Sequence, residues 1–262
     1  MPLFAPVHTT FQYAHPVADE YEPASYWSDR LAGQYDLRGT GHLAYSAGYN
    51  DWLYRKKRRA LRRALRSLEP GARALDLGSG TGWVVQELMR AGARVEGCDI
   101  AELAVERLRE RFPEATFFQT TLGTEPLPQD DASFDVVTAL DVMYHVTDDE
   151  AWLRATREAA RVLRPDGLLI TSDGMGIADR VPRSHVRFRS SQRWAEAASE
   201  AGLRLERLDP YFRWLSRDRE EGAIVGRLPD RARGMVEYAL ETLVPRSPHM
   251  RLAVFSRHSS SS

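Results

Sequence analysis

The stretch from Arg73 to Trp83 constrains the fold more than any other part of the chain. A short apolar run, Ala74 to Leu77, stops at three alternating glycines before helical spacing resumes at Trp83. This pattern predicts a strand, a tight turn and the start of a helix. Glycines at alternate positions permit positive φ angles and let a ligand lie against bare main chain. We therefore expect a nucleoside-binding edge here, and a tight turn without a ligand is the alternative.

The glycine spacing indicates which nucleoside is bound. The dinucleotide fingerprint is G-x-G-x-x-G, whereas this chain has Asp76-x-Gly78-x-Gly80-x-Gly82. The pattern resembles motif I of the class I S-adenosylmethionine-dependent methyltransferases. Three further features resemble that family in order and spacing, and they lie at Asp99 (the ribose acid), at residues 133–140 (motif II) and at residues 163–167 (a proline-glycine turn). The resemblance covers residues 70–173.

Apolar strands that alternate with helices over this span predict a parallel, doubly wound sheet. The resemblance implies an α/β, Rossmann-like sheet of seven mostly parallel strands with helices on both faces, in which residues 250–257 form an antiparallel last strand. We divide the chain into an extended N-terminal arm (1–24), a helical, aromatic-rich lid segment (25–69), the S-adenosylmethionine-binding domain (70–258) and a tail (259–262). Within the domain, residues 213–248 are expected to form a helical insertion that contributes to the lid.

Ligands of such sheets lie beyond the carboxyl ends of the strands. Asp99 is placed there to accept both ribose hydroxyls, and it also suits the N-cap of a helix over residues 101–112. For S-adenosylmethionine and its product S-adenosylhomocysteine, the resemblance implies a binding set of Asp76, Gly78, Ser79, Gly80, Gly82, Asp99, Ile100, Thr121, Leu122 and Asp141. Family members often carry an acid for the adenine amino group where this chain has Gly123. We therefore expect adenine contacts from Thr121 or from the backbone around Leu122.

Tyr49, Trp52 and Tyr54 are our candidates for a substrate lid, because aromatic walls are typical of small-molecule sites. Simple packing of these aromatics against the sheet is the alternative. Residues 55–66 carry eight basic side chains in twelve. Because apolar residues such as Leu61 and Leu65 fall on one helical face, we interpret the basic run as a solvated helix face, not as a site for a phosphate-rich partner.

His145 is our candidate general base, because it follows the fourth expected strand and imidazole titrates near neutrality. Tyr144 is a second catalytic candidate, and a structural role is the alternative for both. Methyl transfer from a sulfonium mainly requires the acceptor atom to be held about 3–3.5 Å from the methyl group with water excluded. A base helps only an acceptor that must lose a proton. The basic residues in 180–189 are interpreted as solvated loop residues; a pocket mouth for a carboxylate or phosphate is the alternative.

Charge and composition exclude several classes of function. With 36 basic and 37 acidic residues, the net charge of −1 gives no overall field that draws the chain to nucleic acid or a membrane. One cysteine excludes an intramolecular disulfide, and the seven histidines show no metal-binding spacing, so we expect no metal. We see neither a membrane span nor a signal peptide, and we expect a cytoplasmic location. The expected partner is a small-molecule substrate, with a homodimer left open.

The sequence therefore predicts an S-adenosylmethionine-dependent methyltransferase that acts on a small molecule. Oxygen, as hydroxyl or carboxylate, is the acceptor we favour because of His145, and natural-product biosynthesis is the setting we consider. The alternatives are an N- or C-methyltransferase, or a fold relative that binds the cofactor without methyl transfer. A dinucleotide-dependent oxidoreductase is disfavoured by the glycine spacing.

Overall fold

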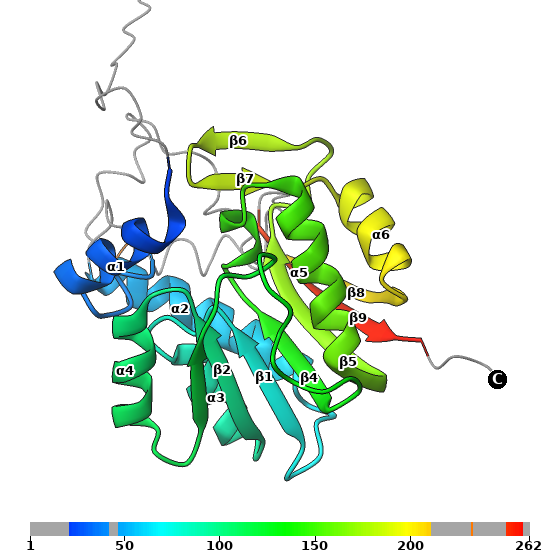
Figure 1. Cartoon of the computed structure of the whole chain (residues 1–262), viewed down its shortest axis with the longest axis horizontal. Helices are drawn as coiled ribbons and strands as arrows, with labels where there is room; N and C mark the ends of the chain where they lie inside the picture. The colour runs from blue at the N-terminus through cyan, green and yellow to red at the C-terminus, as the bar shows by residue number, and fades with distance from the viewer. Residues whose placement is uncertain (1–20, 42–46, 211–231, 233–249, 259–262) are drawn as a thin grey trace, which may run out of the picture.

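The computed structural model describes residues 21–41, 47–210, 232 and 250–258 (Figure 1). Its helices are α1 (Pro23–Gly33), α2 (Ala47–Ala64), α3 (Trp83–Arg90), α4 (Glu102–Arg111), the 3-10 helix η1 (Met143–His145), α5 (Asp149–Val162) and α6 (Ser191–Glu200). Its strands are β1 (Arg73–Leu77), β2 (Arg94–Asp99), β3 (Thr116–Gln119), β4 (Phe134–Ala139), β5 (Leu163–Asp173), β6 (Arg180–Arg183), β7 (Val186–Phe188), β8 (Leu203–Pro210) and β9 (Arg251–Arg257).

Seven of the strands form one sheet in the order β3-β2-β1-β4-β5-β9-β8. Strands β1 to β5 pair in parallel, whereas β9 runs antiparallel to both of its neighbours, β5 and β8. The predicted Rossmann-like sheet of seven mostly parallel strands is therefore confirmed. Because β1 to β5 are parallel, the segments that follow them meet at one edge of the sheet, where ligands of this architecture bind.

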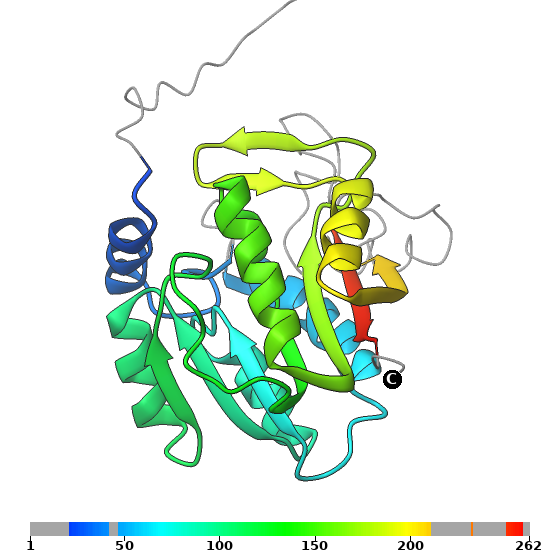
Figure 2. The same cartoon turned by 45° about the vertical axis from the view of Figure 1, so that its right-hand side comes forward.

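Helices cover both faces of the sheet and create two cores (Figure 2). Successive side chains of a strand point to opposite faces, so in β1 Ala74 joins the core with α2, α3 and α4, while Leu75 joins the core with α5 and α6. In the second core the rings of Trp152 and Trp194 meet edge to face at 4.9 Å. Parallel strands that are buried on both faces read as apolar runs, which explains why the sequence located them well.

The N-terminal segment is tied to the glycine turn. α1 lies beside α4, and the Arg30 guanidinium donates to the backbone carbonyls of Gly39 and Gly41 at 2.6 and 2.5 Å. The hydroxyl of Tyr35 donates to the Gly80 carbonyl at 3.1 Å. Residues 1–20 of the expected arm, the expected insertion over 213–248 apart from Ala232, and the expected tail lie outside the described residues.

Two expectations after β4 differ from the structure. β5 already begins at Leu163, so the turn expected over residues 163–167 is an irregularity inside the strand, with Asp166 at a φ of 62°. The basic residues after β5 are not a loop, because β6 and β7 form an antiparallel hairpin at the top of Figure 1. The sequence shows no alternation of apolar and polar residues that would predict this hairpin, because all of β6 is exposed.

A buried polar network joins this hairpin to the core. The Arg189 side chain is fully buried, pairs with Asp149 at 3.1 Å and lies over the Trp152 ring. At the end of β5, one carboxylate oxygen of Asp173 accepts from the Trp194 indole at 2.9 Å and the other accepts from the backbone N–H of Gly174. Burial raises the pKa of Asp173 to about 7.

Replacing Asp173 with asparagine should change how stability depends on pH. A carboxyl whose pKa is higher in the folded chain contributes stability that is fully present below its unfolded pKa and lost as pH rises through its folded pKa. The free-energy advantage of the wild type over Asp173→Asn should therefore fall between pH 4 and 8, by at most about 4 kcal/mol. Urea unfolding across this range measures it. Asp130→Asn, at an exposed position, is the control; a constant gap for Asp173→Asn would contradict the prediction.

Candidate functional site

One cavity of about 340 Å³ lies beyond the carboxyl ends of the central strands. Its size is typical of small-molecule sites, which span about 300–1,000 Å³. The lining comes from the segments after four successive strands: after β1 (Gly78, Ser79, Gly80, Thr81), after β2 (Asp99, Ile100), after β3 (Thr120, Thr121, Leu122, Thr124) and after β4 (Asp141, Val142, His145). Eight of the predicted cofactor residues and the predicted base thus face one space.

The glycine turn after β1 is fixed to β2. The backbone N–H groups of Gly78 and Ser79 both donate to the Cys98 carbonyl, at 2.9 and 2.8 Å. Gly78 has a φ of +72°, and a Cβ on it would lie 2.5 Å from the Val142 side chain. No other residue type fits there without strain. The turn therefore brings bare backbone against the cavity.

Asp99 holds the far side of this turn. One carboxylate oxygen accepts from the Gly80 N–H at 2.7 Å and the other from the Ala101 N–H at 2.9 Å. A carboxylate has about four acceptor positions, so both oxygens keep capacity toward the cavity. Burial raises the pKa of Asp99, although the hydrogen bonds from the backbone N–H groups act to lower it. The expected N-cap role is wrong in position, because α4 has Ala101 as its N-cap and Asp99 instead binds that residue's N–H.

Asp76 and Gly82 belong to the predicted binding set but are not among the residues that line the cavity. Asp76 is buried, and one of its carboxylate oxygens accepts from the Thr138 hydroxyl at 2.7 Å. Its other oxygen has no hydrogen-bond partner among the described residues, and burial raises its pKa to about 7. Gly82 is the N-cap of α3. Both residues support the turn from behind.

The position where relatives often carry an adenine-binding acid is sterically closed. Gly123 has a φ of +80°, and a Cβ there would lie 1.9 Å from the Ala151 carbonyl oxygen. The Arg154 guanidinium donates to the Gly123 carbonyl at 2.6 Å and holds it against α5. A side chain at this position is therefore excluded, while Thr121 and Leu122 line the cavity.

A partly buried ion pair that was not predicted from the sequence lies beside the cavity: Asp141 lines the cavity, whereas Lys57 is not among the lining residues. The Lys57 ammonium of α2 donates to Asp141 at 2.5 Å and lies 4.8 Å from the centre of the Tyr54 ring. The Ser172 hydroxyl contacts the other Asp141 oxygen at 3.0 Å. Burial alone would lower the pKa of Lys57, but the Asp141 carboxylate outweighs it and the pKa is raised. The Lys57 side chain is therefore an ammonium ion.

Helical spacing contained a signal for Lys57. It lies three residues after Tyr54 and four before Leu61, two residues that are 1% and 0% exposed. Residues at this spacing share a helix face. Because Lys57 lies within a run of basic residues, it was interpreted with them as part of the solvated helix face, although it lies on the inner face of α2.

The proton on His145 can be assigned from its neighbours. Its Nδ1 lies 2.6 Å from the backbone carbonyl oxygen of His185, and a carbonyl oxygen can only accept, so Nδ1 carries the proton. Nε2 therefore keeps a lone pair. The ring packs edge-on against Trp27 and is stacked near the His185 ring. Burial lowers the pKa of His145 to about 3, although the His185 carbonyl opposes this shift, and the ring is neutral at physiological pH.

Of the three predicted lid residues, the structure describes the side chain of Tyr54. Its hydroxyl lies 3.2 Å from the Thr40 hydroxyl, and the ring lines the cavity and contacts Trp83. The side chains of Tyr49 and Trp52, both on α2, lie outside the described residues. Lining residues that sequence reasoning missed include Trp27, Leu31 and Thr40 of the N-terminal segment.

Tyr144, the second catalytic candidate, is not among the residues that line the cavity. Its ring packs against Phe188 of β7 at 5.1 Å and against His145 at 4.5 Å. None of the arginines of the β6–β7 hairpin lines the cavity either, and Arg187 pairs instead with Asp149 at 2.7 Å.

Within the described ranges, His, Cys, Asp and Glu side chains do not gather in the groups of three that a metal ion would need. None of the helices in those ranges has the length and apolar character to cross a membrane.

The sheet order, the glycine turn, the acid after β2 and the cavity between them define the class I S-adenosylmethionine-dependent methyltransferases. Residues 75–171 match the family model described as a methyltransferase domain, and they form a domain of this class, whose cofactor is S-adenosylmethionine.

Named relatives agree with this assignment. Over 112 residues the chain is 40% identical to the 27-O-demethylrifamycin SV methyltransferase of Amycolatopsis mediterranei, and this match covers 40% of each of the two chains. The 1,6-didemethyltoxoflavin-N1-methyltransferase of Burkholderia thailandensis, solved with S-adenosylhomocysteine, has a TM-score of 0.57 at 17% identity and covers 94% of this chain and 93% of its own. The (4+2)-cyclase SpnF has a TM-score of 0.54 at 20% identity, covering 77% of this chain and 81% of its own. These two structures share the fold.

The chain spans between 34% and 45% of the length of the curated relatives it matches. α1 and α2, which contribute the lining residues Trp27, Leu31 and Tyr54, and the β6–β7 hairpin are outside the 75–171 match to the family model.

Proposed function

We propose that this protein is an S-adenosylmethionine-dependent methyltransferase whose acceptor is a hydroxyl on a small, largely apolar molecule. The observation that carries the proposal is that the cofactor residues and the neutral imidazole of His145 line the same cavity. Aromatic and apolar residues of the N-terminal segment, Trp27 and Leu31, line it too and support an apolar acceptor.

The residues present fit the cofactor. Bare backbone at Gly78, a doubly anchored carboxylate at Asp99 and hydroxyls after β3 suit a nucleoside, with Asp99 holding the ribose and Thr121 and Leu122 at the adenine. Elsewhere in the lining, Asp141 offers a carboxylate to the ammonium of the amino-acid end of the cofactor, and Lys57 holds that carboxylate from outside the cavity. When bound, S-adenosylmethionine supplies an electrophilic methyl group on a sulfonium.

His145 would position the acceptor and take its proton. With Nδ1–H held by the His185 carbonyl, Nε2 can accept a hydrogen bond from a hydroxyl. A carboxylate acceptor has no proton to offer to it, so this tautomer favours a hydroxyl. A weak base suffices, because an alcohol oxygen becomes strongly acidic as its bond to carbon forms and its proton can then pass to Nε2. Burial of the site keeps water from competing.

The alternatives remain distinct in chemistry. A neutral amine needs no base, so an N-methyltransferase would not depend on Nε2 of His145. A cofactor-binding protein without transfer would share the fold, as a cyclase does among the structural neighbours. Natural-product biosynthesis is the setting we propose, because a rifamycin-type methyltransferase is among the relatives.

A panel of alcohols, phenols, amines and carboxylic acids with ¹³C-methyl-labelled S-adenosylmethionine tests the proposal. The methyl carbon shift of the product in NMR separates an ether from an ester, an amine or a C-methyl product. An ether is expected. Labelled amine products alone would favour the nitrogen alternative, and cofactor binding without any product would favour the fold relative.

Replacing Lys57 with methionine should weaken S-adenosylhomocysteine binding about 10- to 100-fold, the cost of one charge-assisted hydrogen bond, because the variant no longer holds the Asp141 carboxylate that faces the cavity. The affinity for 5′-methylthioadenosine, which lacks the amino-acid end, should stay unchanged. Calorimetric titration of both ligands measures the difference, and Lys56→Met on the same helix is the control. Equal losses for both ligands would show that Lys57 acts through the structure of the site and not on the amino-acid end.

A further inference from the structure

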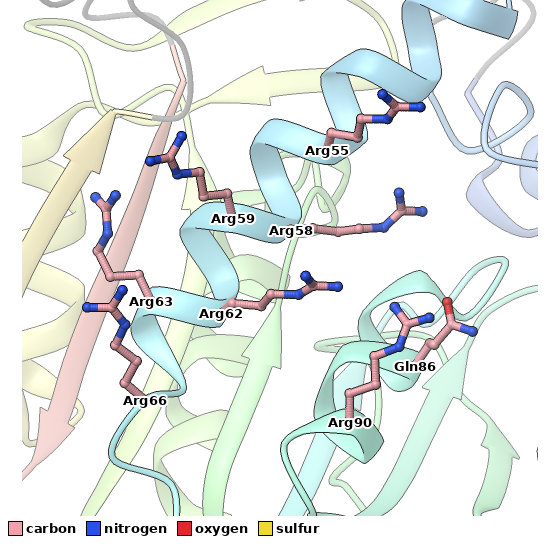
Figure 3. A pocket seen from close by; sticks show the side chains of 8 residues that line it. All are labelled: Arg55, Arg58, Arg59, Arg62, Arg63, Arg66, Gln86 and Arg90. Atoms are coloured by element: carbon pink, nitrogen blue, oxygen red, sulfur yellow. The ribbon is translucent and has the colours of Figure 1, made fainter.

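A second hollow on the described surface is separate from the cavity that contains the predicted cofactor residues. It has a volume of about 710 Å³ and runs along the outer side of α2 beside α3 (Figure 3). We call it the arginine groove, and its lining is Arg55, Arg58, Arg59, Arg62, Arg63, Arg66, Gln86 and Arg90. Figure 3 shows Arg58 and Arg62 directed toward Arg90 of α3, while Arg59, Arg63 and Arg66 point away from α3.

The groove already binds one carboxylate on its own floor. Glu87 of α3 is 1% exposed and accepts from Arg62 through both Nε and Nη2, at 2.5 and 3.1 Å. Arg90 donates to the same carboxylate at 2.6 Å. These contacts show that the arginine side chains here adopt the forked geometry that recognises carboxylates.

A second carboxylate, Asp51, pairs with Arg55 at 2.7 Å, but the two carboxylates leave most of the positive charge unmatched. Arg59, Arg63 and Arg66 are exposed, and no acidic side chain in the described part of the chain forms an ion pair with them. The whole chain has a net charge of −1. Because the seven groove arginines with Asp51 and Glu87 sum to +5, the rest of the chain sums to −6.

We propose that the arginine groove binds an acidic α-helix of a partner protein. Arginines repeat at i, i+4 on α2, as Arg55, Arg59, Arg63 and as Arg58, Arg62, and Arg66 follows in the turn after the helix. From Arg55 to Arg63 the repeat spans about 12 Å, or two helical turns. Carboxylates at i, i+4 on a facing helix repeat at the same interval of about 6 Å.

Other polyanions fit less well. The groove lining contains no aromatic side chain on which a nucleic-acid base could stack. An amphipathic helix that lies on a bilayer needs a free apolar face, but on α2 the apolar residues Leu61 and Leu65 are buried in the core.

Fluorescence anisotropy with the full chain tests the proposal. The probe is a labelled 14-residue helical peptide, stapled on one face and carrying two rows of glutamates at i, i+4 on the other. A peptide of the same composition with glutamates spread around the helix is the matched probe. The wild type is expected to bind the two-row peptide more tightly than the spread peptide. The variant Arg59→Glu/Arg63→Glu is expected to bind the two-row peptide about tenfold more weakly than the wild type does.

The control variant Arg94→Glu/Arg107→Glu makes the same charge change at exposed arginines of β2 and α4 and should leave binding unchanged. Arg63→Gln/Arg66→Gln, a milder change, should show an intermediate loss. Equal affinity for the two peptides, or equal loss in the control variant, would overturn the proposal. So would tighter, groove-dependent binding of a 20-nucleotide oligothymidylate or of phosphatidylglycerol vesicles. Titration with S-adenosylhomocysteine measures the cofactor site separately, so failure of the groove proposal can be distinguished from failure of the methyl-transfer proposal.

Discussion

Replacing Asp99 with alanine is expected to weaken S-adenosylhomocysteine binding by about 100-fold or more. Hydrogen bonds to a charged group contribute about 1.5–3 kcal/mol each, and we expect this carboxylate to accept from two ribose hydroxyls. Its position is fixed before the ligand arrives, because the Gly80 and Ala101 N–H groups hold one oxygen each. Calorimetric titration of the wild type and the variant measures the loss.

The same backbone contacts require a control, since alanine also frees two N–H groups that hold the glycine turn. An analogue of S-adenosylhomocysteine without ribose hydroxyls separates the two effects. If Asp99 binds the ribose, the wild type should lose affinity for the analogue, while Asp99→Ala should bind both ligands equally. Asp99→Asn should lie between the two, because one amide oxygen replaces the charged pair. A variant that still discriminates between the two ligands would place the ribose elsewhere.

Strands β1 and β4 could be predicted to within a residue, because burial on both faces gives each of them a largely apolar run that ends just before a glycine or an acid. The antiparallel β9 followed from the family pattern. The β6–β7 hairpin could not be predicted, because its strands carry exposed residues and its anchor, Arg189, is buried only through partners from distant parts of the chain, such as Asp149. An arginine in a sequence gives no sign of such partners.

The residues of the candidate site also fall into two groups, those that could be predicted from the sequence and those that could not. Residues that follow a strand within the 75–171 match, such as Gly78, Asp99 and Asp141, could be located because topology sends every strand end to one edge. Residues from outside that match could not. Trp27 and Thr40 line the cavity because of the path that the N-terminal segment takes. Lys57 lies on the same helix face as Tyr54, and this position is clear only once the burial of that face is known. The Gly123 position shows the opposite case, where the missing acid is explained only by the close approach of Ala151.

With a hydroxyl acceptor from the panel, His145→Gln and His145→Ala are each expected to reduce kcat by about 100-fold or more, the usual contribution of a positioned general base. The affinity for S-adenosylhomocysteine should change little, because His145 is placed on the acceptor side. His185→Gln is the matched control. Its ring stacks near His145, but the contact to Nδ1 comes from the backbone carbonyl, which the substitution keeps. Steady-state kinetics and titration of each variant separate the two readouts.

The pH profile gives a second test of His145. Because burial lowers its pKa to about 3, the imidazole is already neutral at pH 5 and gains nothing as the pH rises. The wild-type kcat should therefore show no limb near pH 6.5, where an exposed histidine titrates. Phenols, whose own proton is more acidic than that of alcohols, should lose less kcat in His145→Gln than alcohols do, since they depend less on a base. Equal losses for the two acceptor classes would assign His145 to positioning alone, and an unchanged kcat would exclude it from the reaction.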